Sequence, residues 1–212
     1  MMKASILLVN LLAPIALHAS AVYSNTTTDT GGTVFYSTGP YVQIGDNITL
    51  AGTERSANSA TAEFFDGGTG SGTFDATLRF FNAGSPVGAQ IGGAFTVTGT
   101  AITSGNVVDV TWNLGGLVLP TNVIFTISES NVASGLDLGF TLFEPPTVGS
   151  SSNQFYIVST NGTTYSQASQ GNNQDNLFFF LDASPVSVPE PGTMVLTLLA
   201  LSVITQARKW LR

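Results

Sequence analysis

The chain has 212 residues, of which 43% are hydrophobic and 9% are charged, and it contains no cysteine. This length is sufficient for one domain with a sizeable core, while the lack of cysteine excludes disulfides, a thiolate nucleophile and cysteine-based metal sites. Residues 22–183 have twelve acidic and two basic side chains and neither histidine nor lysine, so we expect no nucleic-acid partner and no common general base.

The first 21 residues are predicted to form a secretory signal peptide. Lys3 is followed by an apolar segment from Ala4 to Leu17 and by the small residues Ala19-Ser20-Ala21. A basic start, a short apolar run and a small-residue cleavage pattern are the three parts of such a leader. We therefore expect an N-terminal helix that is cleaved after Ala21, and export of the rest of the chain. A buried N-terminal helix is the alternative.

Residues 22–183 are predicted to form one all-β domain. Short apolar runs are separated by turn-forming residues, such as Gly45-Asp46,. In the run 73–81 the even-numbered residues are apolar, whereas Phe81 shares the other face with polar residues, as in a strand half covered by a core,. The predicted strands are 33–36, 41–44, 47–50, 60–65, 73–81, 108–114, 123–127, 136–142, 154–158 and 177–181.

The number and spacing of these strands indicate the architecture. About ten short strands without an amphipathic helical stretch favour a two-sheet antiparallel sandwich of jelly-roll type. Residues 184–191 contain three prolines and are interpreted as an extended linker,. The domain is thus predicted to end at residue 183.

Residues 192–212 are predicted to form a single transmembrane helix. No charged residue occurs from Gly192 to Ala207, and the basic residues Arg208, Lys209 and Arg212 follow. Such a run spans about 24 Å as a helix, and extension to Leu211 brings it close to the ~30 Å hydrocarbon core. With an exported domain before it, the basic end stays cytoplasmic. A permanent anchor and a temporary one removed by processing are both compatible with this length.

The end of the chain combines Pro189, Glu190, Pro191 and Gly192 with an apolar run and a basic cluster. This order resembles the PEP-CTERM sorting signal of exopolysaccharide-producing Gram-negative bacteria, although Trp210-Leu211 interrupts the basic cluster. The resemblance implies transient residence in the inner membrane and processing near the Pro-Glu-Pro motif by an exosortase, a membrane cysteine protease or transpeptidase. The two targeting signals, together with a body that lacks histidine, cysteine and lysine, favour a non-enzymatic protein of the cell surface or extracellular matrix (biofilm), with exopolysaccharide as a possible partner.

Two other functions remain open for the body of the chain. Exposed aromatic side chains stack on sugar rings, which would make the domain a carbohydrate-binding module, although Trp112 is expected in the core. A pair of carboxylates would make it a glycan hydrolase, but scattered glutamates on strands are usually solvated, so we expect no catalytic residue. The aromatic candidates are Tyr36, Tyr41, Tyr156, Tyr165 and Trp112, and the carboxylate candidates are Glu54, Glu63, Glu129 and Glu144.

Two kinds of modification or ligand site are suggested more weakly. Asp175, in a cluster of amide and acidic side chains, and Asp46 are candidates for a structural calcium, but no EF-hand pattern is present and turn formation explains both,. Glycosylation sequons begin at Asn25, Asn47 and Asn161,. We therefore expect no resident cofactor.

Overall fold

The structure is a computed structural model that describes residues 19–35, 42–84, 87–151, 156–168 and 176–185. In this part of the chain the regular elements are all β-strands, and no helix is long and apolar enough to cross a membrane. The predicted signal-peptide helix and transmembrane helix, and most of the linker, lie outside the described residues.

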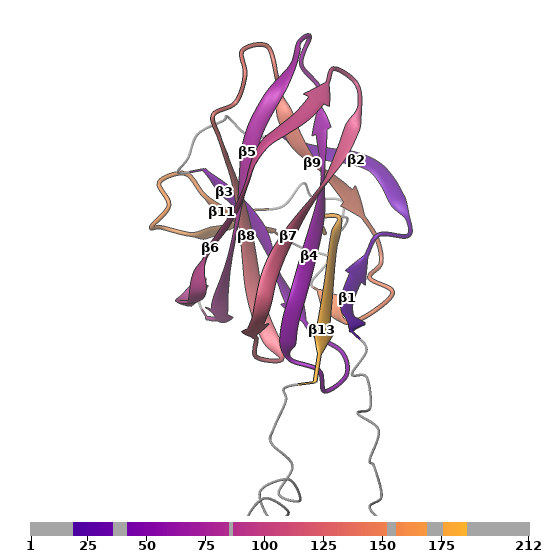
Figure 1. Ribbon diagram of the computed structural model, residues 1–212, viewed down its shortest axis with the longest axis vertical. Coiled ribbons are helices and arrows are strands. Elements are labelled where there is room, and N and C mark those ends of the chain that lie inside the picture. The colour runs from indigo at the N-terminus through magenta and orange to yellow at the C-terminus, as the bar shows by residue number, and fades with distance from the viewer. Residues whose placement is uncertain (1–18, 36–41, 85–86, 152–155, 169–175, 186–212) are drawn as a thin grey trace, which may run out of the picture.

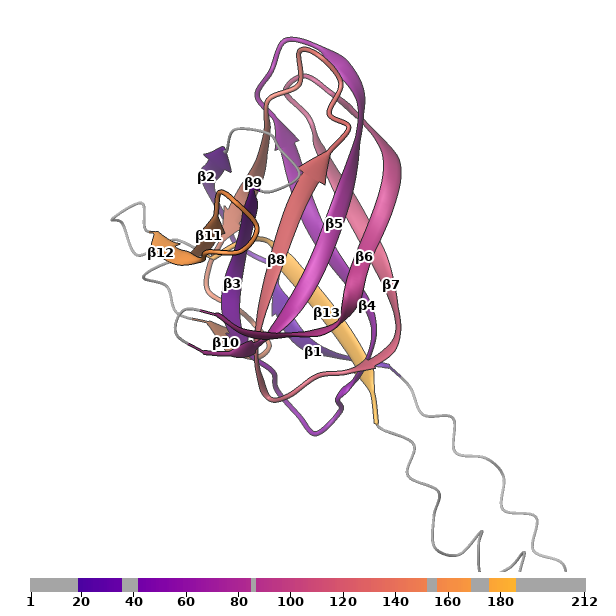
Figure 2. The same ribbon diagram turned by 90° about the vertical axis from the view of Figure 1, so that its left-hand side faces the viewer.

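Two antiparallel sheets form a sandwich, which confirms the predicted all-β architecture (Figures 1 and 2). The six-stranded sheet has the order β1-β13-β4-β9-β2, with β7 also paired to β4, and the seven-stranded sheet has the order β12-β11-β3-β8-β5-β6, with β10 also paired to β3. The strands are β1 (Ser20–Asn25), β2 (Asp29–Phe35), β3 (Gln43–Thr49), β4 (Ser56–Asp66), β5 (Ser71–Ala83), β6 (Val87–Thr103), β7 (Val107–Val118), β8 (Asn122–Ser130), β9 (Leu138–Phe143), β10 (Ser150–Ser151), β11 (Tyr156–Ser159), β12 (Ser166–Ala168) and β13 (Phe179–Ser184).

The strands from β2 to β9 pair as nested hairpins. Strand β5 pairs with β6, β4 with β7, β3 with β8 and β2 with β9, and these pairs belong alternately to the seven-stranded and the six-stranded sheet. A long hairpin wrapped in this way around a common core has the connectivity of a jelly roll. The wrapping places the β2-β9-β4-β7 sheet against the β3-β8-β5-β6 sheet.

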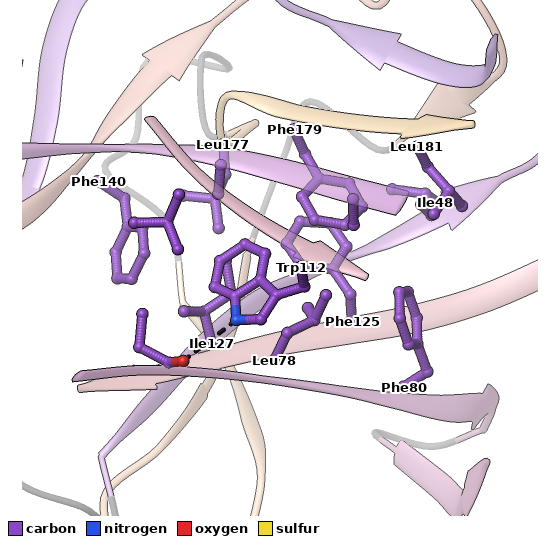
Figure 3. Packing of buried hydrophobic residues seen from close by; sticks show 14 of the residues in the cluster. Ile48, Leu78, Phe80, Trp112, Phe125, Ile127, Phe140, Leu177, Phe179 and Leu181 are labelled. Atoms are coloured by element: carbon purple, nitrogen blue, oxygen red, sulfur yellow. Dashed lines mark hydrogen bonds between the residues drawn. The ribbon is translucent and has the colours of Figure 1, made fainter. Parts of the chain in front are cut away.

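The core lies between the two sheets and is rich in aromatic side chains. Phe125 of β8 stacks on Phe179 of β13, with ring centroids 3.8 Å apart. Trp112 is 1% exposed and donates its indole N–H to the carbonyl oxygen of Ala76, 3.1 Å away (Figure 3). Trp112 is therefore a core residue, as predicted. Burial of each such side chain contributes roughly 1.5–3 kcal/mol.

A second, smaller apolar cluster lies on the outer face of the seven-stranded sheet. Phe81, which the alternation of 73–81 places with the polar residues, is only 6% exposed because it packs on Ile124 and Ile157. Tyr165 packs edge-on against Phe81, and its hydroxyl donates a hydrogen bond to Gln43 Oε1 at 3.1 Å. This face is thus partly covered, which a two-residue periodicity does not reveal.

The predicted turn at Gly45-Asp46 is wrong, because β3 runs straight through both residues. Gly45 lies opposite Thr126 of β8, where a Cβ atom would be 1.7 Å from the carbonyl oxygen of Phe125. Glycine occurs at this position because the neighbouring strand approaches closely, a role that glycine has within sheets.

Strand β6 was not among the predicted strands, although it is the longest of the described elements. Its sequence contains many glycine, alanine and threonine residues, and most of its side chains are exposed. The strand forms an edge of its sheet and pairs only with β5, with three register shifts. Its apolar side chains that contact the core, Ile91, Phe95, Val97 and Ile102, are irregularly spaced, because the register shifts interrupt the two-residue alternation.

Candidate binding face of the six-stranded sheet

An apolar row crosses the outer face of the six-stranded sheet. In the registers of β7, β4, β9 and β2, Val107 lies opposite Phe65, Phe65 opposite Gly139, and Gly139 opposite Phe35. Val107 and Phe35 are 53% and 43% exposed, two of the three large apolar side chains that the described residues leave exposed. The row is therefore available to a ligand.

Gly139 allows the two aromatic rings of this row to meet. A Cβ atom at this position would lie 2.9 Å from Cδ1 of Phe35 and 2.7 Å from Cγ2 of Thr33. With no side chain there, the Phe35 ring reaches over β9 and packs edge-on against Phe65, with centroids 5.9 Å apart. The geometry is one that aromatic pairs prefer.

A polar row runs beside the apolar one and is displaced from it by two residues on each strand. Glu63 lies opposite Asp109 of β7, and Thr141 of β9 lies opposite Thr33 of β2. The hydroxyl of Thr141 contacts the Glu63 carboxyl and favours its charged form. Two carboxylates and two hydroxyls thus follow one another across the four strands.

The electrostatic environment of this row is negative. Partial burial raises the pKa of Glu63, and the negative charges of Asp109 and Asp29 raise it further, against the opposing effect of the Thr141 hydroxyl. Thr141 is 7% exposed, and its Oγ1 atom makes no hydrogen bond of standard geometry with the described residues, although it touches the Glu63 carboxyl. Glu63 therefore lies in a negative, partly desolvated environment.

The two rows border a surface groove of about 380 Å³. Gly31 and Gly32 form part of its wall. A Cβ atom at Gly31 would meet nothing within 4 Å, whereas one at Gly32 would lie 3.2 Å from Cδ1 of the buried Leu142. The groove is lined by Asp29, Gly31, Gly32, Thr33, Glu63, Phe65, Val107, Thr141 and Phe143.

Two other surface hollows differ from this groove in their chemistry. One, of about 430 Å³, is lined among the described residues by polar side chains and Ala83, with no aromatic or charged residue. The other, of about 470 Å³, lies between β6 and β7 and includes Phe95 and Trp112 but no carboxylate. The groove on the six-stranded sheet alone among these three combines aromatic, hydroxyl and carboxylate groups.

The glutamates considered as a hydrolytic pair lie in four different environments. Glu63 is on the outer face of β4, whereas Glu129 is buried on β8, where burial and the negative charge of Asp137 raise its pKa to about 8. Glu54 lies in the loop between β3 and β4 and accepts a hydrogen bond from the Thr53 N–H. Glu144 follows β9 and acts electrostatically on buried Tyr23. Glu63 therefore has aspartates, not another of these glutamates, as its charged neighbours.

The structure describes the side chain of one of the tyrosines considered for sugar stacking, Tyr165, and it does not line the groove. Tyr36 and Tyr41 lie outside the described residues, and Tyr156 belongs to β11 on the opposite sheet. Tyr165 is half-buried and bonded to Gln43, so its ring packs on the protein. The aromatic side chains of the groove are phenylalanines instead.

The structure also bears on the candidates for a calcium site and on the first glycosylation sequon. Asp46 is buried in β3 and accepts a hydrogen bond from the Asn47 N–H, whereas Asp175 lies outside the described residues. In the part of the chain described, no group of three acidic or histidine side chains is placed to hold a metal ion. Asn25 is wrong as a glycosylation site, because it is fully buried and its Nδ2 donates to the carbonyl oxygens of Phe143 and Leu177.

The other two sequons and the cleavage pattern lie at the surface. Asn47 is half-buried, whereas Asn161 is exposed and its side-chain oxygen accepts the Thr163 and Thr164 N–H groups. Ala19 and Ala21 are exposed, but Ala21 already belongs to β1 and pairs with Asp182. The sorting motif and basic cluster (Pro189, Glu190, Pro191, Gly192, Arg208, Lys209 and Arg212) lie outside the described residues.

Sequence reasoning missed Phe35, Phe65, Thr141 and Gly139 as members of a site. The only local signal is the alternation of Thr61, Glu63 and Phe65, which marks one face of β4 as mixed polar and aromatic,. The other strands of the face are separated from β4 by many residues, and only their registers bring the rows together.

No family model, no curated protein and no solved structure matches this chain.

Proposed function

We propose that the chain is an exported, non-enzymatic protein of the cell surface or extracellular matrix, released from the membrane by processing of its C-terminal segment. The observation that carries this proposal is the three-part order of that segment: Pro189-Glu190-Pro191, then an apolar run, then a basic end. An exosortase-type enzyme of the inner membrane is the processing partner that this order implies.

The arrangement of the two ends of the described chain supports a domain that is attached to the membrane at one end of the sandwich. Strand β1 pairs with β13, and Ser20 lies opposite Ala183, so the chain enters and leaves the sandwich side by side (Figure 1). Ser56, at the start of β4, pairs with Ser184 at the same pole, whereas Phe65 is nine residues further along β4. The groove is therefore roughly 30 Å from the point where both ends emerge.

Processing is tested by replacing the motif residue between the two prolines. We expect Glu190→Ala to leave the uncut chain in the membrane fraction of a host that has an exosortase, while the unsubstituted protein reaches the surface with a new C-terminus near Glu190. Cell fractionation followed by mass measurement of both termini reports the outcome. Glu54→Ala, which changes the charge equally in a loop of the domain, serves as the control.

Two results would contradict the proposal. One is a cell-surface form of the unsubstituted protein that still ends at Arg212. The other is equal processing of the Glu190→Ala chain and the control.

A further inference from the structure

We propose that the groove on the six-stranded sheet binds a polysaccharide chain that carries no acidic groups. This inference deepens the proposed function, since it rests on a domain presented at the cell surface or in the extracellular matrix and names a ligand for it and the site that holds this ligand. The site consists of the apolar row (Val107, Phe65, Gly139, Phe35) and the polar row (Asp109, Glu63, Thr141, Thr33).

The two rows match the amphipathic character of a sugar ring. A pyranose has an apolar face of C–H groups and a rim of hydroxyls, and aromatic side chains bury such apolar faces favourably. Phe65 supplies the aromatic surface, with Val107 and Phe35 exposed on either side of it. Rows two residues apart along a strand are separated by roughly 7 Å, about the width of one ring, so a sugar stacked on Phe65 directs its rim toward Glu63.

The polar row offers the hydrogen-bonding groups that sugar hydroxyls need. The carboxylates of Glu63 and Asp109 accept hydrogen bonds, and the Thr33 hydroxyl both donates and accepts. Thr141 Oγ1 is shielded from solvent and touches the Glu63 carboxyl, whose charged form it favours. Hydrogen bonds to an ionised carboxylate are also stronger than those between neutral groups.

Charge decides which polysaccharides fit. Asp29, Glu63 and Asp109 lie at or beside the groove, and none of the described residues that line it is basic. The like charges already disfavour ionisation of Glu63, so an added uronate, sulfate or phosphate would meet further repulsion. Neutral sugars and amino sugars avoid this cost.

The length of the rows favours a chain over a single sugar. Four neighbouring strands at about 4.8 Å spacing give each row a length of roughly 14 Å, longer than one ring. The residues that line the groove come from β2, β4, β7 and β9, so a ligand that fills it contacts all four strands.

The proposal is tested by affinity electrophoresis of the full chain, purified in a mild non-ionic detergent. Native gels contain hydroxyethyl cellulose, a neutral galactomannan, or alginate, which is a polyuronate. We expect retardation in at least one neutral gel and none in alginate. Phe65→Ala should weaken that retardation about tenfold, and Glu63→Gln by a smaller but measurable factor.

Matched controls separate the groove from general effects. Glu54→Gln makes the same charge change outside the groove, and Val118→Ala removes an apolar side chain that is also exposed on β7 but absent from the groove lining. Both should be retarded like the unsubstituted chain. If Phe65→Ala does not fold, as judged by circular dichroism, the nearly isosteric Glu63→Gln decides the outcome.

Three results would overturn the proposal: no retardation in either neutral gel, retardation in alginate, or equal retardation of the unsubstituted chain and both groove variants. These assays use purified protein and do not depend on processing. Retardation in a neutral gel together with normal processing of the Glu190→Ala chain would therefore refute the proposed sorting and leave the groove proposal standing. Blocked processing of the Glu190→Ala chain together with no retardation in either neutral gel would support the sorting and refute the groove proposal.

Discussion

Glu129 places a carboxyl group among apolar side chains on the inner face of β8. It follows Phe125 and Ile127 in the two-residue alternation of that strand and is 7% exposed. The sequence interpretation, a solvated glutamate on a strand, is wrong for this residue. Burial and the neighbouring negative charge of Asp137 raise its pKa to about 8, so the carboxyl is largely protonated at neutral pH,.

The buried Glu129 makes folding stability pH-dependent. In the unfolded chain this side chain titrates near its ordinary pKa of 4.5, whereas in the folded protein it holds its proton to about pH 8. Raising the pH from 4.5 to 8 therefore lowers stability, and the loss from this group is roughly 3 kcal/mol by pH 7. Glu129→Gln should remove this part of the slope and raise the free energy of unfolding at pH 7–8.

Urea denaturation at a series of pH values measures this effect. Glu54→Gln, the same exchange in a loop, should keep the slope of the unsubstituted protein. Parallel pH curves for the Glu129→Gln and Glu54→Gln variants would show that Glu129 does not carry a raised pKa.

At the scale of elements, Asp66 joins three loops at the pole opposite the chain ends. Its Oδ1 accepts the N–H groups of Gly68 and Asp137, at 2.8 and 2.9 Å. Its backbone N–H donates to the Asn106 carbonyl oxygen, and its own carbonyl oxygen accepts the Gly105 N–H. The β4–β5, β6–β7 and β8–β9 connections thus meet at one fully buried residue.

Loss of the Asp66 side chain should destabilise this pole. Asp66→Ala leaves two backbone N–H groups without their acceptor, which costs roughly 2 kcal/mol after allowance for the burial of the carboxylate itself. Asp109→Ala, an exposed aspartate on β7, should change the free energy of unfolding by less than about 0.5 kcal/mol. Chemical denaturation compares the two variants, and equal effects would refute the role of Asp66.

A strand could be predicted from the sequence where one of its faces packs on the core. The alternations around Phe74, Val110 and Phe125 predict β5, β7 and β8, because these strands are packed on the core on one side. Strand β6 has no regular alternation because its register shifts change the spacing of the side chains that contact the core, and β3 contains Gly45 for a reason that lies on the neighbouring strand. Local sequence cannot report a contact of this kind.

For the whole molecule, the charge is strongly one-sided. Residues 22–183 contain twelve acidic side chains against Arg55 and Arg79. Like charges on a folded domain repel one another, and this repulsion destabilises the compact state. Raising the NaCl concentration from about 0.01 to 0.15 M shortens the screening length from roughly 30 to 8 Å.

We therefore expect the Tm at pH 7 to rise by a few degrees over this salt range. Differential scanning calorimetry measures the shift. Near pH 4.3, where the net charge of the chain approaches zero, the shift should shrink. A Tm that falls with added salt at pH 7 would show that attractive ion pairs outweigh the repulsion.

The sequence by itself determined the all-β class, the sandwich and the placement of Trp112 in the core, because two-residue alternation and turn residues act locally. It also contains the whole argument for export and sorting, which depends on the order of residues in the terminal segments. Only the tertiary structure decided that Glu129 is buried, whereas Glu63 is half-buried on the outer face of β4. It alone assembled Phe35, Phe65, Glu63 and Thr141 on one face, because strand registers set by pairing between distant segments determine which side chains share a face.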